Sequence, residues 1–180
     1  MTEWLNKIDF SVLYRIQQTL RCDFLDFFFR IFTHLGDFGA IWIVTAAVLL
    51  FCRRTRRTGI RLFVGLLAGF LVGNLLIKNL VARPRPCWLD PTVSLLIPVP
   101  ADFSFPSGHA LSSAVAATVL SGSGWRAACL SVPVALLIAF SRLYLFVHFP
   151  SDVLAGIVIG FLIGLGTLFF RRGAQNRDFL

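Results

Sequence analysis

Hydrophobic residues run along the chain in five long blocks, which short polar segments separate. The blocks cover approximately residues 37–52, 59–81, 107–120, 125–145 and 151–170. A helix needs about 20 apolar residues to cross a bilayer, and the second, fourth and fifth blocks reach that length. The first and third blocks are shorter, and we expect flanking residues to extend them. The pattern therefore predicts an all-α integral membrane bundle with about five transmembrane helices.

The first 36 residues follow a different pattern. Apolar side chains recur there at helical spacing, at Leu5, Ile8, Val12, Ile16 and Leu20. A second apolar stretch runs from Asp23 to Phe32. The region is too polar to cross a bilayer and too apolar for water, so we expect amphipathic helices that lie in the membrane interface. Two alternatives remain open: these helices pack against the core, or residues 9–32 form a sixth span.

The composition agrees with a membrane protein. Of the 180 residues, 57% are hydrophobic and 14% are charged, whereas soluble domains average about 45–50% apolar and about 25% charged residues. So few charges cannot cover the apolar surface of a short chain, which disfavours a disordered segment, a nucleic-acid-binding arm and an ordinary soluble enzyme. We expect residues 1–180 to form one membrane-embedded domain, with an interfacial segment at 1–36 and a transmembrane core at 37–172.

The basic residues indicate which side of the membrane each loop faces. Many of them follow the first, third and fifth blocks: Arg53, Arg54, Arg56, Arg57, Arg61, Arg126, Arg171, Arg172 and Arg177. With five spans these positions share one side, which the positive-inside rule makes cytoplasmic. The N-terminal segment and the loop at 83–106 are then extracytoplasmic. We therefore attribute the net charge of +8 to the orientation of the chain in the membrane and to the anion site described below, and we expect no nucleic-acid partner.

Two series of glycines lie at four-residue spacing within the second and fifth blocks: Gly65, Gly69 and Gly73, then Gly156, Gly160 and Gly164. Small residues at this spacing let two helix backbones approach closely. The close contact is either between helices of one chain or between two copies, and the sequence leaves the oligomeric state open.

Residues that can bind or transform an anion lie at the outer ends of the blocks. They are Lys78, Arg83, Arg85, Ser107, Gly108, His109, Arg142, His148 and Asp152. The alternating direction of the spans brings all of them to one face of the membrane. Ionisable groups are rare in membrane spans and mark a functional site by default. We therefore predict a site on the extracytoplasmic side.

The residue types at this face favour a phosphate. Lysine and arginine match its charge, and the arginine fork binds its oxygens bidentately. The helix start at Ser107 adds backbone N–H groups. His148 and Asp152 lie four residues apart, so the carboxylate can hold one ring nitrogen while the other attacks. Singly, these features have structural explanations, as snorkelling cations, a turn or a structural His–Asp pair; together they favour chemistry.

Three spaced motifs contain these residues. In the first motif, Lys78 is followed after six residues by Arg85-Pro86. The second is the run Pro-Ser-Gly-His, which begins at Pro106. In the third, Ser141-Arg142 is followed after five residues by His148 and after three more by Asp152. In this order and spacing the chain resembles the type 2 phosphatidic acid phosphatases, a superfamily that also includes glucose-6-phosphatase and the vanadium haloperoxidases. The resemblance covers about residues 78–152, and the flanking helices fit the family's helical core.

The resemblance implies catalytic roles. His148 attacks phosphorus and forms a phosphohistidine, Asp152 orients His148, and His109 protonates the leaving oxygen and then activates water. It also implies a phosphate-binding set, namely Lys78, Arg85, Ser107, the Gly108 amide and Arg142. Arg83 is a further candidate contact outside the signature. The resemblance implies no cofactor and no metal, and no His, Cys or carboxylate set in the sequence has metal-ligand spacing.

The expected activity is metal-independent hydrolysis of a lipid phosphate or pyrophosphate by a multi-pass cell-membrane protein, at the extracytoplasmic face. We favour undecaprenyl pyrophosphate over phosphatidylglycerol phosphate and phosphatidic acid, because a compact chain without added domains suits recycling of a carrier lipid. The expected partners are this lipid and the bilayer. The alternatives are a lipid phosphotransferase that uses the same phosphohistidine, and a non-catalytic protein that binds or flips lipids.

Overall fold

The structure is a computed structural model that describes residues 3–169. Its elements are α1 (Glu3–Thr19), α2 (Asp23–Phe32), the 3₁₀ helix η1 (Thr33–Gly39), α3 (Ala40–Phe51), α4 (Arg56–Gly69), the π-helical η2 (Phe70–Ile77), α5 (Lys78–Val81), α6 (Pro86–Leu89), α7 (Gly108–Ser121), α8 (Trp125–Tyr144) and α9 (Pro150–Phe169). Between residues 3 and 169 there is no β-strand, so the all-α prediction is confirmed.

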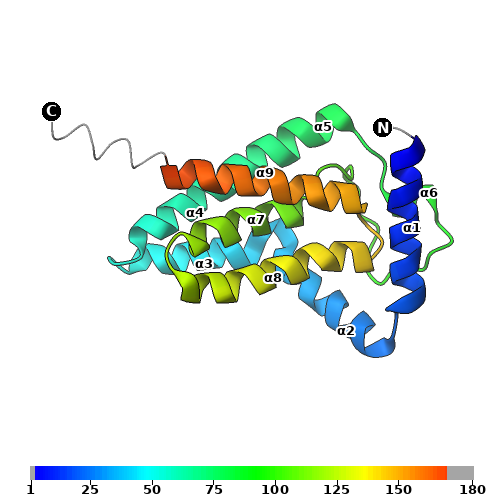
Figure 1. Ribbon diagram of the computed structural model, residues 1–180, viewed down its shortest axis with the longest axis horizontal. Coiled ribbons are helices and arrows are strands. Elements are labelled where there is room, and N and C mark those ends of the chain that lie inside the picture. The colour runs from blue at the N-terminus through cyan, green and yellow to red at the C-terminus, as the bar shows by residue number, and fades with distance from the viewer. Residues whose placement is uncertain (1–2, 170–180) are drawn as a thin grey trace.

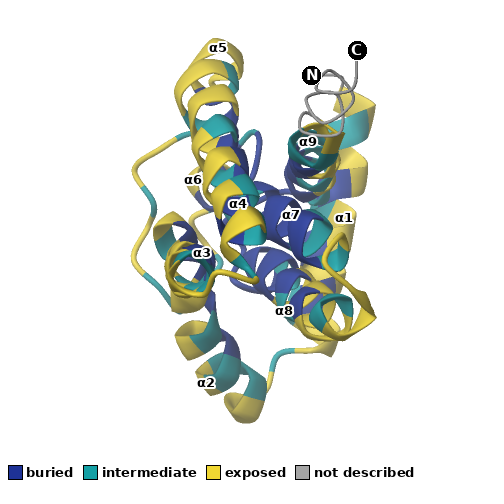
Figure 2. Cartoon of the chain, turned by 90° about the vertical axis from the view of Figure 1, so that its left-hand side faces the viewer, coloured by how far each residue is buried: buried dark blue, intermediate teal, exposed yellow. Residues whose placement is uncertain are grey.

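The helices α3, α4, α7, α8 and α9 lie side by side along the long axis of the molecule, and α1 lies across one end (Figure 1). The centre of the bundle is α7, which the other helices surround (Figure 2). Its Leu111, Val115 and Val119 belong to a buried apolar core together with Trp42 and Ile138 from neighbouring helices. The Arg-rich turn between α3 and α4 lies at the end opposite α1.

Four helical segments are long and apolar enough to cross a membrane, namely Asp23–Phe51, Arg56–Leu89, Trp125–Tyr144 and Pro150–Phe169. They match four of the five predicted blocks. The third block forms α7, whose 14 residues correspond to about 21 Å, against a hydrocarbon core of about 30 Å. Its flanks do not extend it as we expected, because Ser107 caps the helix at its start and the chain leaves helical geometry again at Gly124.

The N-terminal region divides into two parts that behave differently. Helix α1 ends at Thr19 and α2 begins at Asp23, so residues 9–32 do not form one continuous helix. One face of α1 packs on the core through Leu13 and Ile16, while apolar side chains such as Trp4 remain exposed. The first candidate span, Asp23–Phe51, begins earlier than the predicted 37 because it includes α2 and η1, which a kink at Asp37 and Phe38 separates from α3.

The two glycine series pack helices of the same chain together. A Cβ at Gly160 would lie 2.3 Å from the Leu111 carbonyl oxygen of α7, and one at Gly156 would lie 2.6 Å from the Ser107 oxygen. Helix α9 therefore approaches the backbone of α7 more closely than any side chain would permit. The Ser107 amide also donates a 3.1 Å hydrogen bond to the Asp152 carbonyl. This contact fixes the starts of α7 and α9 relative to one another.

Candidate active site

A cavity of about 1090 Å³ lies between the start of α7, the end of α8 and the loop at residues 97–103. Its lining includes most of the predicted site residues, namely Lys78, Arg85, Gly108, His109, Arg142 and His148. These side chains come from α5, the loop before α6, the start of α7, the end of α8 and the turn before α9. The alternation of helix direction therefore brings them together, as the sequence predicts.

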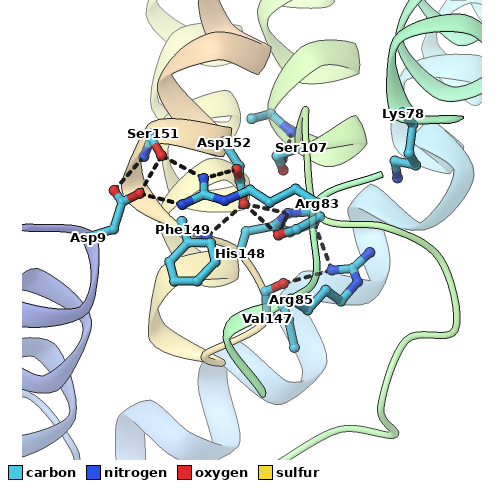
Figure 3. Close-up of polar contacts among 12 residues, drawn as sticks. Asp9, Lys78, Arg83, Arg85, Ser107, Val147, His148, Phe149, Ser151 and Asp152 are labelled. Atoms are coloured by element: carbon cyan, nitrogen blue, oxygen red, sulfur yellow. Dashed lines mark hydrogen bonds and ion pairs between the residues drawn. The ribbon is translucent and has the colours of Figure 1, made fainter. Parts of the chain in front are cut away.

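His148 lies in the turn between α8 and α9, where Phe146 adopts a left-handed conformation with φ 59°. The ring is 2% exposed, and its Nε2 lies 3.0 Å from Nη1 of Arg85 (Figure 3). Arginine is only a donor, so Nε2 is the unprotonated nitrogen and carries the lone pair. Burial, followed by the charges of Arg85 and Arg142, holds the pKa of His148 well below its usual value. The ring is therefore neutral and suited to nucleophilic attack.

Asp152 supports His148 through Ser104. The Asp152 carboxylate lies 3.8 Å from Nδ1 of His148, which is too long for a hydrogen bond. The Ser104 hydroxyl donates to Oδ2 of Asp152 at 2.5 Å and lies 3.4 Å from Nδ1 of His148. Ser104 is fully buried. A serine hydroxyl thus bridges the predicted His–Asp pair: its oxygen faces the protonated Nδ1 of His148 as an acceptor, and its hydrogen is donated to Asp152.

Arg83 lies outside the cavity lining, so the structure does not place it as the phosphate contact that we expected. Its guanidinium donates to Asp152 at 2.5 Å, Asp9 at 2.8 Å and Ser151 at 2.8 Å, and also to Asn6 (Figure 3). The Arg83, Asp9 and Asp152 side chains are at most 5% exposed. Arg83 therefore ties α1 to the carboxylate behind His148.

The cations of the cavity hold a carboxylate from the long loop. Lys78 Nζ lies 2.5 Å from Asp102 Oδ2 and Arg85 Nη2 lies 2.7 Å from Asp102 Oδ1. Burial raises the pKa of the Asp102 carboxyl, but the hydrogen bond from Lys78 and the charge of Arg85 outweigh it and hold that pKa below its usual range. Arg142 donates to Thr33 at 2.5 Å, and its buried Nε has no hydrogen-bond partner among the described residues.

Ser107 and Gly108 contribute differently to the site. Ser107 is fully buried, lies outside the cavity lining and caps α7 by accepting from the Ala110 amide. Gly108 lines the cavity at the positive end of the α7 dipole. A Cβ at Gly108 would lie 2.8 Å from Oδ1 of Asn74 in η2. Gly108 thus lets the Asn74 side chain pack against the start of α7 at the cavity wall, whereas the Ser107 hydroxyl caps the helix.

A match to a protein family agrees with this geometry. The PAP2 superfamily matches residues 58–175, which is more than half of the chain and includes all three predicted motifs. The chain belongs to the PAP2 superfamily. The predicted family is therefore confirmed.

Two curated relatives of this chain are phosphatases by name. An undecaprenyl-diphosphatase of Sulfolobus acidocaldarius is 38% identical over 123 residues, which cover 67% of this chain and 58% of that protein, less than two thirds of its length. A decaprenylphosphoryl-5-phosphoribose phosphatase of Mycobacterium tuberculosis is 34% identical over 135 residues, covering 73% of this chain and 72% of that protein.

A solved structure extends the likeness to the whole fold. The transmembrane PAP2-type phosphatidylglycerolphosphate phosphatase from Bacillus subtilis superposes with a TM-score of 0.78 and 26% identity, covering 96% of this chain and 88% of that one. Together with the four apolar helical segments, this likeness identifies a multi-pass membrane protein.

Four carboxyl or hydroxyl residues of this PAP2 chain border the site without belonging to its signature: Asp9, Asp37, Asp102 and Ser104. Asp37 is within hydrogen-bond distance of His109, since its Oδ1 lies 3.0 Å from Nε2 of the ring. The only signal in the sequence is that Asp102 and Ser104 closely precede the Pro-Ser-Gly-His run. Among residues 3–169 no group of three or more His, Cys, Asp or Glu could hold a metal ion.

Proposed function

We propose that this protein is a membrane lipid phosphatase that hydrolyses a polyprenyl pyrophosphate or a related lipid phosphate through a phosphohistidine. One observation carries the proposal: the neutral, buried His148 directs its Nε2 toward a cavity where Lys78, Arg85 and Arg142 converge. A nucleophile beside three cations suits attack on a phosphoryl group, because the cations stabilise the charge on its oxygens. The proposed chemistry uses side chains alone, without a metal ion.

The phosphoryl group binds where Asp102 now lies. Its oxygens replace the carboxylate on Lys78 and Arg85, and the unpartnered Nε of Arg142 supplies a further donor. The amide at Gly108 adds a donor at the helix start. These groups hold the phosphorus within reach of His148.

In the first step, Nε2 of His148 attacks phosphorus and the bond from phosphorus to the leaving oxygen breaks. His109 gives its proton to that oxygen, so the lipid leaves as an alcohol or, from a pyrophosphate, as a monophosphate. The proton on Nδ1 of His148 remains hydrogen-bonded to Ser104, whose hydroxyl donates to Asp152. This chain stabilises the positive charge that develops on the ring.

In the second step, a water molecule attacks the phosphohistidine. His109, now neutral, takes a proton from that water as the P–N bond breaks. Inorganic phosphate leaves and Nε2 of His148 regains its lone pair. The two steps together consume one water and release one phosphate.

The apolar part of the cavity wall supports a lipid substrate. Ile43 of α3 and Phe63, Leu67 and Phe70 of α4 and its continuation line the cavity. Each of these side chains is also at least 46% exposed on the outside of the bundle. The wall therefore continues onto the surface that faces acyl or prenyl chains, which gives a lipid a path from the bilayer to His148. A polyprenyl chain is favoured because two relatives carry prenyl lipids in their names.

The proposed side of the membrane follows from charge. The Arg-rich turn lies at the bundle end opposite α1, whereas the α8–α9 turn, whose His148 lines the cavity, lies toward α1. Positive loops remain in the cytoplasm. The cavity then opens at the extracytoplasmic face, where the phosphate groups of outer-leaflet lipids lie.

The test is phosphate release from undecaprenyl pyrophosphate, phosphatidylglycerol phosphate and phosphatidic acid by purified protein in detergent. We expect release that persists in EDTA, is fastest with the pyrophosphate and is lost in His148→Ala. Acid-labile ³²P on the wild-type chain but not on His148→Ala identifies the intermediate. Full activity of His148→Ala refutes the covalent mechanism, loss in EDTA refutes the metal-free chemistry, and turnover only with an added acceptor identifies a transferase instead.

A further inference from the structure

We propose that Asp37 is a positioning residue that orients His109 and favours the protonated ring that leaving-group protonation requires. The inference rests on the proposed function, because it concerns the acid step of that reaction. Asp37 lies in η1, a segment that the sequence pattern assigned to the edge of a span, 72 residues from His109 along the chain.

The backbone at Asp37 departs from helical geometry. Asp37 itself has ψ 124°, Phe38 has φ 51° and Gly39 has φ 70°. A left-handed conformation is disfavoured for a residue with a Cβ, and Phe38 gains no burial there, since it is 97% exposed. Strained conformations of this kind persist where neighbouring contacts determine them. The contacts on either side of Phe38 are with α7, at His109 and Ser112.

The kinked segment at residues 36–39 contacts the His109 ring on two sides. Asp37 Oδ1 lies 3.0 Å from Nε2. Gly36 lies against the other edge, where a Cβ would be 2.5 Å from Cδ2 of His109 and 2.8 Å from Cγ2 of Ile138. The ring therefore has little freedom to turn, and its remaining nitrogen, Nδ1, has no hydrogen-bond partner among residues 3–169 that the structure gives.

Burial, followed by the charge of Arg142, lowers the pKa of His109 to about 4, and the hydrogen bond and charge of Asp37 oppose this shift. Lys78, Arg85 and Arg142 line the same cavity, and each disfavours a second positive charge on the imidazole. Asp102 is bound to Lys78 and Arg85. Asp37 is thus the carboxylate that contacts the ring, and its negative charge favours the imidazolium that an acid catalyst must be.

Asp37 has a second partner that provides a matched control. His34 Nδ1 lies 2.7 Å from Asp37 Oδ2, and the His34 side chain is 61% exposed. His34→Gln alters a contact of the same carboxylate in the same segment but leaves the Asp37–His109 contact in place. Asp37→Asn retains the shape and an acceptor oxygen but removes the charge.

The kinetic test compares two leaving groups. An alkyl lipid phosphate needs a proton on its leaving oxygen, whereas p-nitrophenyl phosphate leaves without one. We expect Asp37→Asn to reduce kcat on the lipid by about 10-fold or more, out of the roughly 10²–10⁴-fold that general acid catalysis supplies, and to affect the aryl phosphate far less. The basic limb of kcat/KM for the lipid should move to lower pH, because His109 loses its proton more easily. His34→Gln should retain the wild-type leaving-group dependence.

A second measurement does not depend on activity. The chain contains three histidines, so ring resonances of ¹⁵N-histidine-labelled protein in detergent are assigned with single His→Gln variants. We expect the pH midpoint of His109 protonation to fall by about one unit or more in Asp37→Asn and to stay near the wild-type value in His34→Gln.

The outcomes separate the two hypotheses. If wild type releases no phosphate from any lipid, the proposed function fails, and the ring titration still decides whether Asp37 acts on His109. Equal losses of kcat on both substrates with an unmoved basic limb, or an unchanged His109 midpoint in Asp37→Asn, would show that Asp37 is only structural and overturn the inference.

Discussion

Removing the Asp102 carboxylate should tighten phosphate binding. The carboxylate makes two charge-assisted contacts, with Lys78 at 2.5 Å and with Arg85 at 2.7 Å, and a bound phosphate must displace both. A hydrogen bond to a charged group contributes about 1.5–3 kcal/mol when buried. The Asp102 side chain is 55% exposed, so solvent screening reduces the sum to about 1–2 kcal/mol. Asp102→Ala is therefore expected to lower the Ki of inorganic phosphate by about 5–30-fold.

The assay is product inhibition of lipid hydrolysis by inorganic phosphate, measured with wild type, Asp102→Ala and Asp90→Ala. Asp90 is the control because it lies in the same long loop, and its carboxylate contacts Tyr14 and Thr92 instead of the cavity cations. Arg85 remains anchored in Asp102→Ala, since its Nε donates to the Asp102 backbone oxygen at 2.7 Å. A Ki that rises in Asp102→Ala, or that falls equally in Asp90→Ala, would refute the idea that this carboxylate occupies the phosphate position.

Three further predictions follow from single contacts. Ser104→Ala should lower kcat for the lipid by about 10-fold or more with little change in KM, because the bridge from His148 to Asp152 acts on the transition state; a change confined to KM would contradict this. Asp9→Asn should destabilise the protein by about 3 kcal/mol, because Arg83 loses a buried partner; thermal unfolding in detergent measures it, and Asp23→Asn at the exposed start of α2 is the control. In the pH profile of kcat/KM, the acid limb that reports protonation of His148 should lie below pH about 6.5, the usual histidine pKa. The pKa of His148 is lowered in the folded protein, so the ring gains its inactivating proton only at lower pH. An acid limb at or above that value would contradict the burial argument.

The convergence of the motifs could be predicted from the sequence, because it depends only on the order and direction of helices. Lys78, His109 and Arg142 lie near helix ends that a bundle must place together, and the structure brings them to one cavity. The length of α7 was less predictable. Its apolar block resembles a span, but the helix begins after the Ser107 cap and ends at Ser121 before Gly122, so it has 14 residues. Its burial by neighbouring helices replaces contact with lipid.

The carboxylates around the motifs could not be predicted, because loops and a kink position them. Asp37 reaches His109 only through the left-handed turn at Phe38 and Gly39, and hydrophobic periodicity contains no signal for such a turn. Arg83 was a further candidate for phosphate contact outside the signature. Its place is decided instead by α1, which lies across the bundle and presents Asp9.

The exposure of each carboxylate indicates which of them moves during the reaction. Asp9 and Asp152 are at most 2% exposed and share Arg83, and separating such a pair leaves a buried charge at a cost of several kcal/mol. They are therefore fixed parts of the site. Asp37 and Asp102 are 43% and 55% exposed, so water can solvate either one when it is released. Asp102 contacts only the cations that bind phosphate, whereas Asp37 contacts a histidine whose proton the reaction needs. Substrate therefore displaces Asp102 and leaves Asp37 in place, and the net positive charge of the empty site becomes available to the phosphoryl group at the moment of binding.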